Sequence, residues 1–96
     1  MTQEEQVKVK IHLDQEVSQG MYVNLALVNH KEEEFTIDVM YLQPQQPVAN
    51  VRARLISTPQ HTKRLMLALQ ENIRRYEDRF GPIKLSGPNP AEQLLQ

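Results

Sequence analysis

The sequence contains no cysteine and no tryptophan, and only 5% of its residues are aromatic. The absence of cysteine excludes disulfides, thiolate metal ligands and a cysteine nucleophile, and it fits a reducing compartment. So few aromatic rings also leave few platforms on which nucleic-acid bases could stack. We therefore expect neither a disulfide-linked secreted domain nor an aromatic-rich binder of single strands.

Positive charge and long apolar runs are also missing. Lysine and arginine number 11 against 12 acidic residues, so the chain lacks the excess of positive charge that favours nucleic acid or anionic membranes. No apolar run approaches the roughly 20 residues that a membrane-spanning helix needs. Residues 1–6 are polar and acidic, where a secretory signal would be basic and then apolar. These absences predict a cytoplasmic protein with no membrane contact and make nucleic acid a disfavoured partner.

The 96 residues, 40% of them apolar, are enough for one small domain. A chain of this length buries one core and has little room for an active-site cleft, which favours a binding role over catalysis. We predict a disordered N-terminus at 1–6, a single domain at 7–83 and a C-terminal tail at 84–96. Asn89, Pro90 and Glu92 have the order of a helix start, so the tail is expected to hold a short helix.

Four segments alternate apolar and polar residues with the period of two that is typical of strands. The clearest is 7–14, in which Val7, Val9, Ile11 and Leu13 alternate with Lys8, Lys10 and His12. The others are 21–28, 35–42 and 48–57, and polar or proline-rich links separate all four. Short polar links predict an antiparallel sheet of four strands.

One long helix is predicted from Pro59 to Phe80. Thr58 can cap its first turn, Pro59 suits the first helical position, and Gly81-Pro82 supplies a stop. At about 100° per residue, an apolar stripe runs along one side of this helix, made of Leu65, Leu69, Ile73, Tyr76 and Phe80. The predicted fold is therefore α+β, with a four-stranded antiparallel sheet and one long C-terminal helix covering one face of it.

No constellation for catalysis or metal binding emerges from the sequence. The three histidines, His12, His30 and His61, do not have the spacing that lets two imidazoles reach one metal ion. The serines all fall at expected turns or caps, which explain them structurally. We predict no catalytic, cofactor-binding or metal-binding residue and a noncatalytic function.

The second face of the predicted sheet is about half apolar, and one helix cannot cover both faces. Exposed apolar patches of several hundred Å² usually mark interfaces, so we expect this face to bind a second copy or a partner polypeptide. The residues assigned to the interface are Tyr22, Ala26, Val28, Met40, Leu42 and Ile56. Self-association into a dimer or tetramer is the favoured interpretation.

A local basic patch gives the alternative function. The cations that could contact phosphate in a small nucleic-acid-binding protein are Arg52, Arg54, Lys63 and Arg64. Asp38, on the neighbouring strand, can pair with Arg52 or Arg54, and a structural ion pair is the favoured role for these strand arginines. An enzyme is the third choice.

Several segments resemble a small bacterial domain family of unknown function over roughly residues 20–83. They include Gly20-Met21-Tyr22-Val23-Asn24, the run from Ser57 to Leu65, and Phe80-Gly81-Pro82-Ile83. The order of four strands, a proline-initiated helix and a short last helix also resembles the export chaperone SecB. That resemblance implies an oligomer with exposed apolar surface that holds polypeptide, although this chain is shorter and poorer in aromatics.

Overall fold

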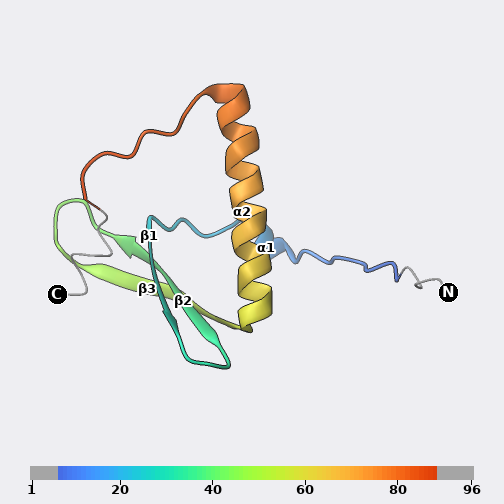
Figure 1. The fold of residues 1–96 in the computed structure, drawn as a ribbon. Helices are drawn as coiled ribbons and strands as arrows, with labels where there is room; N and C mark the ends of the chain where they lie inside the picture. The colour runs from blue at the N-terminus through green and yellow to red at the C-terminus, as the bar shows by residue number, and fades with distance from the viewer. Residues whose placement is uncertain (1–6, 89–96) are drawn as a thin grey trace.

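The computed structural model describes residues 7–88 and has an α+β fold (Figure 1). A short helix, α1 (Gln15–Ser18), precedes three strands and a long helix. The remaining elements are β1 (Leu25–His30), β2 (Phe35–Leu42), β3 (Ala49–Ser57) and α2 (Pro59–Phe80). The terminal segment predicted at 1–6 and the short helix predicted from Asn89 lie outside the described residues.

The three strands form an antiparallel sheet in the order β1-β2-β3, with β2 in the centre. Residues that lie opposite each other share a face of the sheet. Val28, Ile37 and Leu55 form one such row, which belongs to the side facing α2 and is called the helix side below. Leu27, Asp38 and Arg54 form the neighbouring row on the reverse, called the open side. A register shift at Val39/Met40 interrupts the pairing with β3.

The prediction of a strand at 7–14 is wrong, so the sheet has three strands and not four. Residues 7–14 have no regular structure in the described chain, and α1 follows them. An alternating pattern supplies a strand with an apolar face, but a strand forms only where a neighbour receives its backbone hydrogen bonds. None of the three strands described within 7–88 pairs with residues 7–14, which run away from the sheet (Figure 1).

The bounds predicted for α2 are confirmed. The Thr58 side chain accepts a hydrogen bond from the backbone N–H of His61 at 3.1 Å, which satisfies one free donor of the first turn. At the other end Gly81 has φ of 95°, in the left-handed region that favours glycine, and its N–H donates to the Glu77 carbonyl. Local signals at both ends therefore define the helix.

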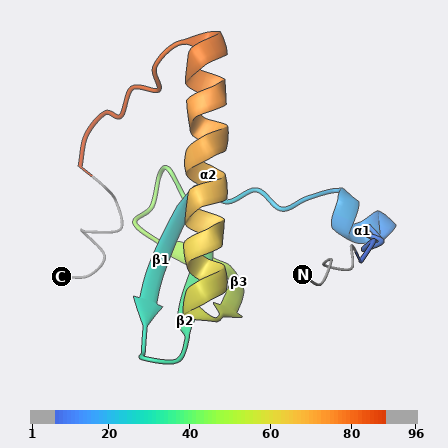
Figure 2. The ribbon, with the colours of Figure 1, turned by 45° about the vertical axis from the view of Figure 1, so that its right-hand side comes forward.

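The described chain has almost no closed core. Leu25 and Met40 are the only buried hydrophobic residues between 7 and 88, and Asp38 is the only buried charged residue there. No residue of α2 is buried, although the helix stands on one side of the sheet in two views (Figures 1 and 2). The helix thus lies over one face of the sheet, as predicted, but its apolar stripe is not buried against that face. Within residues 7–88, no helix has the length and apolarity to cross a membrane.

Candidate interaction surface

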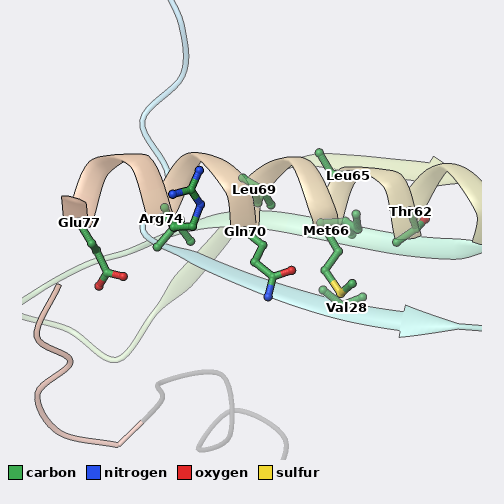
Figure 3. Close-up of a pocket in the computed structure, with 10 residues that line it drawn as sticks. Val28, Thr62, Leu65, Met66, Leu69, Gln70, Arg74 and Glu77 are labelled. Carbon is green, nitrogen blue, oxygen red and sulfur yellow. The ribbon is translucent and has the colours of Figure 1, made fainter. Parts of the chain in front are cut away.

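A groove of about 790 Å³ separates α2 from the helix side of the sheet (Figure 3). Val28 and Ile37 line it from β1 and β2, and the helix contributes Leu65, Met66, Leu69 and Ile73. In the close-up, the Met66 side chain extends from the helix toward Val28. The lining is therefore apolar on both walls, which is the character of a surface that binds another apolar surface.

The apolar wall on α2 follows from the helical repeat. Leu65, Leu69 and Ile73 recur every four residues, so their side chains lie above one another along one side of the helix. Leu69 is nevertheless 55% exposed. A stripe of this kind normally becomes buried against another element, and in a single copy the groove leaves it in contact with water.

Polar side chains form the rim of the groove near the C-terminal half of α2. Arg74 lines the groove and bridges two carboxylates of its own helix, at 2.6 Å from Glu71 and 2.9 Å from Asp78. The hydrogen bond from Arg74 lowers the pKa of Glu71 below its ordinary value, with a smaller contribution from Arg75. Glu77 also lines the groove and accepts a hydrogen bond from the backbone N–H of Ile83 at 2.8 Å.

The open side of the sheet carries the predicted ion pair. The guanidinium of Arg54 donates two hydrogen bonds to Asp38, from Nε to Oδ1 at 2.7 Å and from Nη2 to Oδ2 at 3.0 Å. This bidentate contact satisfies a carboxylate that is buried in the sheet. The hydrogen bond from Arg54 lowers the pKa of Asp38, against a smaller opposing effect of desolvation. The predicted ion pair is thus present, with Arg54 as the partner of Asp38.

The register divides the predicted interface residues between the two faces. Ala26 and Val28 lie opposite Val39 and Ile37 on the helix side, and Val28 lines the groove. Met40, Leu42 and Ile56 belong to the open side, by the alternation of β2 and the pairing of Ile56 with Thr36. Tyr22 precedes β1, and its ring packs edge-on against Tyr41 at 6.0 Å.

Exposure also separates this set. Val28 and Ile56 are exposed, whereas Met40 is only 3% exposed and belongs to the small core of the sheet. The six residues therefore do not form one surface. Val28 is the member that lies in the groove.

The four residues predicted to contact phosphate do not lie on one surface either. Arg54 is engaged by Asp38 on the open side, and Arg52 donates to the carbonyl oxygen of Tyr22 at 3.2 Å. Lys63 and Arg64 lie on α2, which stands over the opposite side of the sheet. A phosphate chain would have to pass around an edge of the sheet to reach all four.

The groove was not predicted from the sequence. The helix stripe was predicted to close the core, so Leu65, Leu69 and Ile73 were not among the predicted contacts. They could have been identified by comparing the length of the helix with the size of the sheet. The apolar stripe of a 22-residue helix is longer than a small sheet can cover. Between residues 7 and 88, no cluster of three or more potential ligands could hold a metal ion.

Comparisons with known proteins give a family but no activity. A search of the curated proteins and a search of the solved structures each found no match, so no link to SecB is shown. A family model described as "Protein of unknown function (DUF3467)" matches residues 1–85, which contains the 20–83 span of the predicted resemblance. The chain therefore belongs to the DUF3467 family.

Proposed function

We propose that this protein is a noncatalytic protein-interaction protein that acts as a homo-oligomer, in which a second copy covers the groove between α2 and the sheet. The observation that supports this most is the near absence of a core in one copy. A helix with a continuous apolar stripe has no buried residue, and the sheet buries only Leu25, Met40 and Asp38 of the described chain. A stable fold needs more burial than this to offset its conformational entropy.

The amount of exposed surface supports the same conclusion. One copy exposes 9432 Å² for 11.2 kDa, whereas a folded monomer of that mass exposes about 5,700 Å². The difference exceeds the roughly 1,000–2,500 Å² per copy that obligate dimers bury. A second copy can therefore supply a large part of the missing contacts.

The rim of the groove favours a second copy as the occupant. It carries both signs of charge within one helical segment, in Arg74 and Glu77. A surface that joins two identical copies about a two-fold axis must be complementary to itself, and a rim with both signs meets that requirement. The net charge of -1 adds little repulsion between copies.

The more specific form of the proposal is a cytoplasmic chaperone or adaptor that binds polypeptide segments, as the SecB resemblance implies. Its support is the order of antiparallel strands followed by a proline-initiated long helix, together with exposed apolar side chains on the open side such as Ile56 and Val51. We expect the natural protein to delay aggregation of a chemically unfolded client, measured by turbidity. No delay at excess protein would contradict the chaperone role and leave self-association untouched.

Self-association itself is tested by one substitution on the helix stripe. Leu69→Asp places a charge where we propose an apolar contact between copies, so the affinity between copies should weaken roughly a hundredfold. The measurement is the mass in solution by light scattering, with circular dichroism to follow the loss of helical signal that dissociation should bring.

Leu67→Asp is the matched control. Leu67 is 50% exposed, close to the value for Leu69, but two residues away it lies on the other side of the helix. We expect Leu67→Asp to keep the natural mass. Equal masses for both variants and the natural protein would contradict the proposal.

A further inference from the structure

Residues 7–13, called the arm below, have the pattern of a strand and no partner in one copy. Val7, Val9, Ile11 and Leu13 are 67–90% exposed, more than most apolar residues of the described chain. They alternate with Lys8, Lys10 and His12, so an extended arm has one apolar face and one basic face. Such a segment gains stability only by adding to a sheet edge that another element provides.

The arm points away from the sheet of its own copy. In Figure 1 it leads outward beyond α1, on the far side of α2 from the strands. The α1 turn that follows the arm is closed by its own hydrogen bonds, from Ser18 N–H to the Asp14 carbonyl and from Gly20 N–H to the Val17 carbonyl. The arm is thus presented to another molecule.

Of the two sheet edges in the described chain, β1 suits the arm better than β3. Edge β3 carries Arg52 and Arg54, which would repel Lys8 and Lys10. Edge β1 carries no Lys, Arg, Asp or Glu, and the turn that follows it holds the acidic run 32–34. Charge therefore selects β1.

We propose that the arm of one copy adds to the β1 edge of a second copy as a fourth strand. Its apolar face then lies on the helix side, beside Ala26 and Val28, and fills the groove against Leu65 and Leu69. Its basic face lies on the open side. This inference rests on the proposed self-association and names the segment that fills the groove.

The absence of cysteine permits a direct test by disulfide trapping. Single-cysteine variants Lys8→Cys, Lys10→Cys and His12→Cys are each mixed with Asn29→Cys, using an isotope label on one partner, and oxidised mildly. Asn29 lies on the open side of β1, so at least one mixture should yield a disulfide-linked pair of one labelled and one unlabelled copy. The control is Ile56→Cys, mixed with the same three variants, because Ile56 lies in the same row of the sheet but on the β3 edge. No cross-link to position 56 is expected.

Three results would overturn the arm assignment while the natural protein remains an oligomer. These are no cross-link to position 29 in any mixture, cross-links to position 56 only, and a double variant Lys10→Cys/Asn29→Cys that closes its disulfide solely within one copy. A natural protein that is monomeric would overturn self-association as well. The two failures are thus distinguishable.

A second pair of variants tests the apolar face of the arm without cysteines. Ile11→Asp should weaken association at least about tenfold, because Ile11 would enter the groove of the partner. His12→Asp, on the basic face, is the control and should have a smaller effect. Unchanged association with Ile11→Asp would contradict the proposal, whatever the cross-linking shows.

Discussion

The central strand β2 and the long helix α2 are both regular elements, yet they differ in what surrounds them. β2 has a hydrogen-bonded strand on each side and contributes the buried residues Asp38 and Met40. α2 is capped at both ends, and its Arg74 pairs with two carboxylates of the same helix, but the helix has no buried residue. The difference indicates that the centre of the sheet is packed within one copy, whereas the apolar stripe of α2 can be buried only against another molecule.

The largest expected effect comes from a methionine in each region. Met40 is 3% exposed and Met66, in the groove, is 52% exposed. Met40→Ala should lower the free energy of unfolding by about 2–5 kcal/mol, because it leaves a cavity in the only core of the sheet. Chemical denaturation followed by circular dichroism measures this.

The matched variant Met66→Ala should mainly weaken association, so its effect on unfolding should fall when the protein is diluted. If both variants destabilise equally at every concentration, α2 is packed within one copy and the contrast between the two regions is lost.

A smaller effect on stability is expected from the ion pair between Asp38 of β2 and Arg54 of β3. The Arg54 hydrogen bond holds the pKa of Asp38 below its ordinary value of 3.8. A lowered carboxylate pKa contributes stability above the unfolded pKa, and that stability is lost as the pH falls through the folded pKa. Asp38→Asn should therefore unfold more easily than the natural protein at neutral pH, and the difference should shrink as the pH falls below 3.8.

The pH profile of urea midpoints for the two proteins measures this difference. A gap that stays constant from neutral to acid pH would show that the ionised pair contributes nothing beyond the shape of the side chain.

The smallest effect is expected at the N-terminal cap of α2. Thr58→Ala removes the acceptor for the His61 N–H and should cost about 1 kcal/mol of unfolding free energy. Thr58→Ser keeps the hydroxyl and should cost much less. If the alanine variant were neutral while Leu69→Asp still dissociated the oligomer, helix stability would come from association rather than from its caps.

The sequence predicts well whatever depends on neighbours along the chain. The bounds of α2 follow from Thr58, Pro59 and Gly81, each of which acts within one turn. The positions of β2 and β3 follow from alternation between proline-rich or polar links, whereas β1 begins at Leu25 and ends at His30, later than the strand predicted at 21–28. An ion pair of Asp38 with Arg52 or Arg54 was also predicted, because charges on adjacent strands have few other ways to be satisfied, and Arg54 is the partner in the structure.

Features set by pairing between segments were predicted less well. The tight connection after β1 places Leu27 opposite Asp38, so the odd residues of β1 share a face with the even residues of β2. Alternation alone does not reveal this parity, and the predicted interface was therefore split between two faces. The prediction of an intramolecular strand at 7–14 was wrong for a related reason. The alternating pattern specifies an apolar face but not the sheet edge with which the strand pairs.

The most direct test of the account is the mass of the natural protein in solution, measured by light scattering on a size-exclusion column over a wide range of concentrations. The account predicts a stable dimer or larger oligomer that loses helical signal when dilution dissociates it, because α2 has no buried face in one copy. A folded, fully helical monomer of 11.2 kDa at every concentration would contradict it.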